Sequence, residues 1–251
     1  MSKNMPPVIT SPNMPGNGVA IYFMGAEKRP IIVIENFIPE PGVLLEEAKR
    51  AAFRPFVRFF PGVQAPFPFA RLNTFLAPHA AHICRAFGFA QLPPTIECGF
   101  ALVTTPPDKL LPLQRIPHID TPDNDRIAVL AYISGERFGG TAFYRHKSTG
   151  FEFIDAARVA AYNTALDRDV EKHGVPAPSY ICGDTGLFER IAAFDAKPGR
   201  ALIYHSNSLH SGTIRNAQAL SNDVAEGRLT LNAFLAPAPV ERNLTASTEN
   251  R

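Results

Sequence analysis

Residues 116–120 read Ile-Pro-His-Ile-Asp, and the interpretation of the whole chain starts from this stretch. Successive side chains of an extended strand alternate between faces, so His118 and Asp120 are expected to point the same way. An imidazole beside a carboxylate supplies two of the three ligands of a facial metal triad. His210, within Leu-His-Ser-Gly at 209–212, is the candidate for the third ligand. The pattern predicts that His118, Asp120 and His210 bind one metal ion.

His205 competes with His210 for the third position, because both follow Ile203-Tyr204. His205 is the last residue of an expected strand, whereas His210 lies beyond it, where the ends of two strands can approach each other. From the residues alone both histidines stay open as the third ligand, with His205 as the alternative to His210.

Arg228 is the second informative residue, at the start of Arg-Leu-Thr-Leu-Asn over 228–232. The alternation places Leu229 and Leu231 on an apolar face and Arg228 and Thr230 on the other. If that other face is solvent, the pattern has no special meaning. If it is the interior of a closed sheet, a buried arginine requires an anion. A guanidinium binds a carboxylate through two hydrogen bonds, and the Thr230 hydroxyl could share that carboxylate.

The rest of the chain predicts many short strands with turns, a few helices and no internal repeat. Strands are expected at 19–23, 31–34, 99–103, 126–133, 141–144, 190–194, 200–205 and 229–235, and helices at about 39–52, 76–89 and 155–172. This is typical of a mainly β fold with flanking helices: a double-stranded β-helix, the cupin-like jelly roll, with N-terminal helices and a helical insertion at about 155–196. We expect a flexible N-terminal arm over 1–17, a single domain over 18–240 and a polar tail over 241–251.

The stretch from Phe53 to Phe69 combines aromatic residues with prolines. Prolines disfavour a regular helix or a central strand, while the aromatic side chains favour burial. Two interpretations stay open: a loop folded back on the core, and a loop that lines or covers a pocket.

Composition narrows the function classes. The 251 residues are 45% hydrophobic and 19% charged with a net charge of +2, so the chain can bury a core and gives no indication of nucleic-acid binding. The three cysteines form no paired motif, which disfavours a disulfide framework or a zinc knuckle. No apolar stretch resembles a signal peptide or a membrane span, so a cytoplasmic location is expected. The sequence does not indicate an oligomeric state.

The ordered motifs resemble those of the Fe(II)/2-oxoglutarate-dependent dioxygenase superfamily, in its prolyl-hydroxylase-like branch. The similar pieces are Glu35–Pro39, Pro117–Asp120, Ala128–Ile133, Gly139–Tyr144, Pro198–Tyr204, Leu209–Gly212 and Arg228–Leu231. The resemblance covers about residues 31–236 without the helical insertion. It implies that His118, Asp120 and His210 bind Fe(II), and that Arg228 and Thr230 bind the cosubstrate 2-oxoglutarate. It also implies an oxygenase that uses O2 to hydroxylate a C–H bond of an amino acid, peptide or small metabolite, releasing succinate and CO2.

Three departures qualify this resemblance. Residues 145–196 are longer than the compact family core, and the strand at 100–103 lacks the tyrosine that relatives offer to the cosubstrate. The interval from His210 to Arg228 is also long and contains Arg215, which is an alternative anchor for 2-oxoglutarate.

Two other function classes remain open from the sequence, because a jelly roll alone does not fix function. One is a cupin-like metal protein, an isomerase or another dioxygenase, that does not use 2-oxoglutarate. The other is a non-catalytic jelly roll that binds a small ligand.

Overall fold

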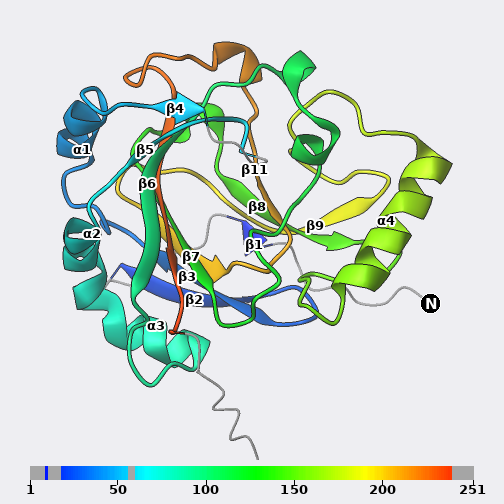
Figure 1. Cartoon of the computed structure of the whole chain (residues 1–251), viewed down its shortest axis with the longest axis horizontal. Helices are drawn as coiled ribbons and strands as arrows, with labels where there is room; N and C mark the ends of the chain where they lie inside the picture. The colour runs from blue at the N-terminus through cyan, green and yellow to red at the C-terminus, as the bar shows by residue number, and fades with distance from the viewer. Residues whose placement is uncertain (1–8, 11–17, 56–59, 239–251) are drawn as a thin grey trace, which may run out of the picture.

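The structure is a computed structural model that describes residues 9–10, 18–55 and 60–238. Two β-sheets face each other, with three helices on one side of the pair and one helix on the other (Figure 1). The expectation of a mainly β jelly roll with flanking helices is confirmed.

The larger sheet has eight strands in the order β2-β3-β10-β7-β12-β6-β5-β4, and each pairs antiparallel with its neighbours. In that order their bounds are Val19–Met24, Arg29–Ile34, Ala201–His205, Ile127–Tyr132, Arg228–Leu235, Thr95–Val103, Gly62–Pro66 and Arg54–Pro55. Strands far apart in sequence are neighbours here, so β12 lies between β6 and β7 and faces the smaller sheet with one row of its side chains.

The smaller sheet has the order β1-β9-β8-β11. Its strands are Ile9–Thr10, Phe188–Phe194, Thr141–His146 and His210–Gly212. Strand β1 pairs parallel with β9, and the other pairs are antiparallel. Ile9–Thr10 falls within the stretch expected to be a flexible arm. Its parallel pairing with Ala192 and Ala193 shows that part of this stretch adds a strand to the sheet.

Helices cover the outer faces of both sheets (Figure 1). Helices α1 (Pro41–Ala48), α2 (Phe69–Leu76) and α3 (Ala80–Phe87) bury leucine and isoleucine side chains in one apolar cluster with the outward row of β12, namely Leu229, Leu231, Ala233 and Leu235. Helix α4 (Val159–His173) shares a second cluster with the smaller sheet. Short 3-10 helices occur at Ala77–His79, Pro107–Lys109, Pro112–Arg115, Glu136–Phe138 and Ala217–Ala219.

A third cluster fills the space between the sheets and includes Ile31, Phe143, Phe194, Leu202 and Tyr204. Burial of apolar side chains on both faces of the larger sheet is the main source of stability in such a fold. Among the described residues, no helix has both the length and the hydropathy needed to cross a bilayer.

The stretch from 53 to 69 is more regular than its prolines predicted. Arg54–Pro55 and Gly62–Pro66 form the edge hairpin β4–β5, and α2 begins at Phe69. Strand β4 is the edge of the larger sheet and tolerates Pro55, because an N–H group on its outer side would have no neighbouring strand to donate to. Residues 56–59, at the tip of the hairpin, lie outside the described residues. The single helix expected over 76–89 is a 3-10 turn that contains Pro78, followed by α3, which ends at left-handed Gly88. The polar tail at 241–251 also lies outside the described residues.

Candidate metal centre

The segment from 116 to 120 is not a regular strand, and the strand expectation is wrong in this respect. His118 instead forms an isolated antiparallel bridge with His210. Two residues further on, the Asp120 amide donates to the Ser206 carbonyl oxygen at 2.8 Å. Pro117 has no amide hydrogen and Pro122 follows shortly after, so a continuous ladder cannot form. The bridge nevertheless fixes this segment beside 206–210.

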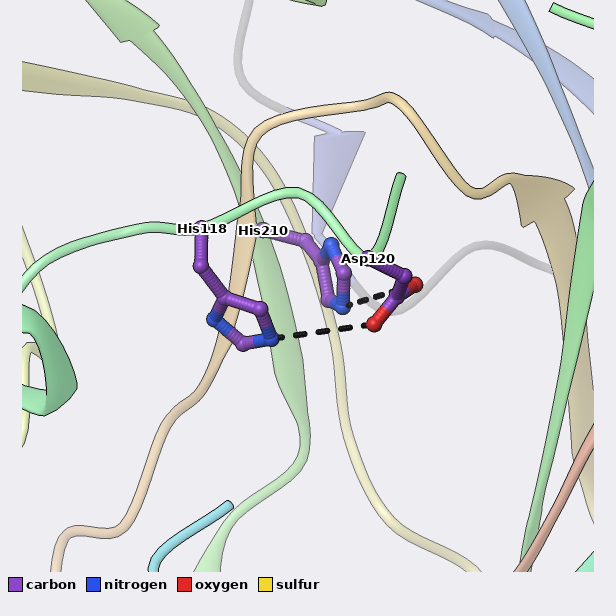
Figure 2. A group of neighbouring side chains, drawn as sticks. All are labelled: His118, Asp120 and His210. Atoms are coloured by element: carbon purple, nitrogen blue, oxygen red, sulfur yellow. Dashed lines mark ion pairs between the residues drawn. The ribbon is translucent and has the colours of Figure 1, made fainter. Parts of the chain in front are cut away.

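The three predicted ligands meet in space (Figure 2). His118 Nε2 lies 3.9 Å from one Asp120 oxygen, and His210 Nε2 lies 3.9 Å from the other. One potential ligand atom from each residue lies within 4.8 Å of the other two. Since metal–ligand bonds are about 2 Å long, small side-chain rotations bring all three atoms to one ion. The structure therefore brings the three predicted ligands together, although their backbone differs from the expected strand.

The two imidazoles are held in the form that binds metals. Burial lowers the pKa of His210 to about 4. Although 46% of the His118 side chain is open to solvent, the protein atoms that surround its ring desolvate it and, with the nearby His210, lower its pKa to about 4. The His210 Nδ1 atom lies 3.0 Å from the Ser208 carbonyl oxygen, which can only accept. Nδ1 therefore carries the hydrogen, and the Nε2 lone pair points toward Asp120.

Asp120 is ionised at neutral pH although its surroundings oppose the charge. Burial raises the pKa of its carboxyl group to about 6, while the nearby His118 and Arg126 act in the opposite direction. At pH 7 the group therefore offers one carboxylate and two neutral imidazoles, with no proton to displace on metal binding.

His205 lies apart from this group. Its Nδ1 lies 3.0 Å from the Asn124 carbonyl oxygen, and its ring packs edge-to-face on Phe87 at 4.9 Å between centroids. Phe87 is the last residue of α3, so His205 points toward the outer helical layer. His205 therefore lies on the helical side of the larger sheet, whereas His210 lies with His118 and Asp120.

Arg228 is buried, with only 5% of its surface exposed. Its Nη2 donates to the Gly140 carbonyl oxygen at 2.9 Å, and its Nε is buried without a partner. Among residues 18–55 and 60–238 no carboxylate pairs with it. Burial lowers the pKa of Arg228, and the nearby Tyr132, Tyr180 and Tyr204 oppose this shift. The sequence left open whether Arg228 faces solvent or the interior of the sheets, and the structure shows that it faces the interior.

Thr230 is also buried on this face, and its Oγ1 lies 3.4 Å from the Ala101 carbonyl oxygen. Arg215, the alternative anchor, has a side chain that is 58% exposed and lies 3.4 Å from Asp195. Arg215 thus already has a carboxylate partner near the surface, whereas Arg228 has none.

Tyr204 connects the metal ligands with Arg228, and the sequence had not assigned it a role. Its ring lies 4.9 Å from that of His210. Burial and the nearby Asp120 raise the pKa of Tyr204, and Arg228 acts in the opposite direction. The available signal was its place on the inward row of the strand that leads to His210.

The model of a family described as a family of unknown function, DUF6445, matches residues 15–235. The chain belongs to the DUF6445 family. No curated protein matches this DUF6445 chain.

Several solved structures have a similar fold. HygX from Streptomyces hygroscopicus, with nickel, 2-oxoglutarate and hygromycin B bound, is 15% identical at a TM-score of 0.48, over 83% of each chain. The epimerase SnoN, in complex with Fe3+, alpha ketoglutarate and nogalamycin RO, is 13% identical at 0.42, over 83% of the DUF6445 chain and 79% of SnoN. An N-substituted L-amino acid dioxygenase from Burkholderia ambifaria AMMD is 13% identical at 0.42, over 85% and 84%. None of these similarities assigns a function to the DUF6445 chain.

Proposed function

We propose that this protein is an Fe(II)- and 2-oxoglutarate-dependent oxygenase that hydroxylates a C–H bond of an amino acid, peptide or small metabolite. The observation that carries the proposal is Arg228, a buried guanidinium without a carboxylate among the described residues. It faces inward from the larger sheet, and Tyr204 lies between it and the group of His118, Asp120 and His210.

The donor set suits Fe(II). Two imidazoles and one carboxylate on one side of an ion leave three adjacent positions for other ligands, which is typical of non-haem iron oxygenases. His118, Asp120 and His210 would hold the ion. The hydrogen bond from His210 Nδ1 to Ser208 keeps one of the imidazoles in the tautomer that can bind it.

Arg228 suits a dicarboxylate cosubstrate. A buried cation without an anionic partner raises the free energy of the ligand-free protein. An anion that binds at this position removes that cost, which makes its binding more favourable. The guanidinium has five N–H donors, of which one bonds to Gly140 and Nε–H is free. The distal carboxylate of 2-oxoglutarate would bind here, beside the Thr230 hydroxyl, while its other end reaches the metal.

When bound, Fe(II), 2-oxoglutarate and O2 would supply an oxidative decarboxylation to succinate and CO2 that is coupled to hydroxylation of the substrate. The chain's own residues bind and orient the reactants. Asp120 and the two histidines fix the ion, Arg228 and Thr230 set the direction of the cosubstrate, and the apolar cluster around Phe143 and Leu202 excludes water from the interior.

Arg228 also separates this proposal from the two alternatives. In a metal protein that does not use 2-oxoglutarate, or in a jelly roll that binds an uncharged ligand, this buried guanidinium would remain without an anion, at a cost in stability. The separation is testable, because substituting Arg228 affects cosubstrate binding and leaves the three metal ligands in place.

The experiment is an anaerobic titration of the Fe(II)-loaded protein with 2-oxoglutarate, followed by visible absorption. We expect a weak charge-transfer band in the wild-type protein and in Arg215→Gln, and a roughly 100-fold weaker affinity for 2-oxoglutarate in Arg228→Gln, equivalent to the loss of about 3 kcal/mol of charge-assisted hydrogen bonding. Succinate formation under air is measured in parallel. A wild-type protein that binds Fe(II) but shows neither the band nor succinate contradicts the proposal.

A further inference from the structure

Arg126 lies directly beside the metal ligands. Its carbonyl oxygen accepts a hydrogen bond from the Ser206 amide at 3.0 Å, and the Ser206 carbonyl oxygen accepts one from the Asp120 amide at 2.8 Å. Arg126 and Asp120 thus flank the same residue on opposite sides. The charge of Arg126 also acts on the Asp120 carboxyl group, as does that of Glu97.

The Arg126 side chain is held in place by contacts that use few of its N–H donors. Its guanidinium lies 3.9 Å above the ring of Phe234, and one Nη2 hydrogen bond joins it to Glu97 at 3.3 Å. Its Nε is buried without a partner, although the side chain as a whole is 21% exposed. Since a guanidinium carries five N–H donors, most of its capacity to bind a carboxylate is free.

Asn232 is the next residue along the same row of β12. It lies two positions from Phe234 and two from Thr230, and its side chain shares their inward direction. Its Oδ1 is buried without a hydrogen-bond partner. Its neighbours across the sheet are Gly99 and Leu130, neither of which has a polar side chain. An N–H or O–H donor from outside the chain can therefore satisfy this oxygen.

The inward row of β12 thus has an arginine at each end. Arg228 begins the row, and Arg126 covers Phe234 six residues further on, which corresponds to roughly 20 Å of strand. The main chain of Asp120 is joined to that of Arg126 through Ser206, whereas the Arg228 side chain bonds to Gly140 at the other end of the row. The two arginines can therefore bind different acids.

We propose that Arg126 binds the carboxylate of the primary substrate and that Asn232 accepts a hydrogen bond from an N–H group of the same molecule. The substrate class is then a small amino-acid-like acid, which carries a carboxylate and an N–H donor in one molecule. This inference rests on the proposed function, because it gives 2-oxoglutarate the other arginine. Glu97, beside Arg126, favours a donor that carries a positive charge.

The test uses the Fe(II)- and 2-oxoglutarate-loaded protein under argon. The probes are the twenty common amino acids and their N-acetyl derivatives, each compared with its own primary amide, which lacks the carboxylate. The readouts are the thermal unfolding midpoint and the position of the visible charge-transfer band. We expect at least one acid to raise the midpoint and shift the band while its amide does neither.

The variants locate this effect. Arg126→Gln is expected to weaken binding of that acid at least 30-fold, and Arg126→Lys to retain part of the affinity because the charge is kept. Asn232→Leu is expected to weaken binding about fivefold. Arg137→Gln is the matched control, because Arg137 also pairs with a glutamate at 3.1 Å and lies over a phenylalanine ring, that of Phe138, but its side chain is 53% exposed. All four variants are expected to keep the band produced by 2-oxoglutarate alone.

The outcomes separate this inference from the function on which it rests. If the wild-type protein shows no band with 2-oxoglutarate, the proposed function fails and the inference with it. If the band is present but no acid binds better than its amide, or Arg126→Gln binds the acid as the wild type does, the inference alone is overturned.

Discussion

His118 and His210 hydrogen-bond to each other through their main chains in both directions. The His118 amide donates to the His210 carbonyl oxygen at 2.9 Å, and the His210 amide donates to the His118 carbonyl oxygen at 3.0 Å. This closed pair fixes the two imidazole rings 4.5 Å apart, independently of any ion. The metal centre is therefore preformed by the backbone, and its side chains can be changed without breaking the bridge.

Substituting His118 tests the metal centre. Because the His118 side chain is 46% exposed and its main-chain bonds do not need the ring, His118→Ala is expected to change the free energy of unfolding by less than about 1 kcal/mol. Its affinity for Fe(II) or Co(II) is expected to fall at least 100-fold, because one of three protein ligands is lost. Metal titration followed by elemental analysis measures this. His173→Ala, at the exposed end of α4, is the control, and equal metal content in the two variants argues against the site.

Arg228 is expected to reduce stability in the absence of an anion. Replacing a buried charge that has no ionic partner with an apolar side chain is often neutral or stabilising by about 1–4 kcal/mol, so Arg228→Met is expected to unfold at the same or a higher urea concentration than the wild type. Adding 2-oxoglutarate at 100 times its Kd then stabilises the wild type by about 2.7 kcal/mol and leaves the variant unchanged. A variant that is destabilised by several kcal/mol without cosubstrate shows that Arg228 is structural instead.

Glu152 joins the turn between β2 and β3 to the segment after β8. It is 3% exposed and accepts hydrogen bonds from the Ala26 amide at 2.8 Å, the Glu27 amide at 2.9 Å and the Arg145 guanidinium at 2.9 Å. Removing Glu152 leaves its buried hydrogen-bond donors without an acceptor, so Glu152→Ala is expected to lower the free energy of unfolding by about 3–5 kcal/mol. Urea denaturation measures this cost against Glu226→Ala, which loses only an exposed pair and about 1 kcal/mol or less.

His205 predicts part of the pH dependence of stability. Burial, with a smaller effect of Arg29, lowers the pKa of His205 to about 4, below the value near 6.5 of an unfolded chain. The unfolded state therefore binds the proton more tightly, and stability declines as the pH falls from about 6.5 toward 4. At pH 5 the loss from this residue is about 2 kcal/mol.

His205→Asn removes this titration and can keep the hydrogen bond to Asn124. Urea unfolding at pH 7.5 and pH 5, with a chelator present throughout, is expected to show a smaller decline for the variant than for the wild type. His173→Asn, with an exposed histidine, is expected to decline as the wild type does. The assignment is wrong if His205→Asn follows the wild-type curve.

The sequence predicted most of the sheets because their strands are regular. β12 alternates without interruption, and β7 and β10 are apolar runs bounded by turns, so local pattern and final position agree. The edge hairpin β4–β5 and helix α2 were missed, because Pro55 and Pro66 resemble breakers until it is known that they lie at the margin of a sheet. The parallel pairing of β1 with β9 joins residues some 180 positions apart, and no local pattern records such a contact.

The candidate site was predictable where chemistry alone marks a residue. His118, Asp120 and His210 are common metal-ligand residues in a recognisable order, and Arg228 is the one charged residue of its strand. The sequence did not mark Arg126, Asn232 and Tyr204. Each lies in an ordinary sequence context, and only its contacts with neighbouring strands in the folded chain draw attention to it. An unpaired nitrogen or oxygen atom is a property of the folded chain, and the sequence does not show it.

The bond from Arg228 to the Gly140 carbonyl oxygen has one more consequence. Arg228 begins β12 of the larger sheet, whereas Gly140 precedes β8 of the smaller one and bonds through its own amide to Thr213 at 2.9 Å. The guanidinium thus links the two sheets through this hydrogen bond, in addition to its proposed role in anion binding. If 2-oxoglutarate binds there as proposed, it would stabilise this link, and the rate at which proteases cut the protein in a cell extract would fall as the 2-oxoglutarate content of the extract rises.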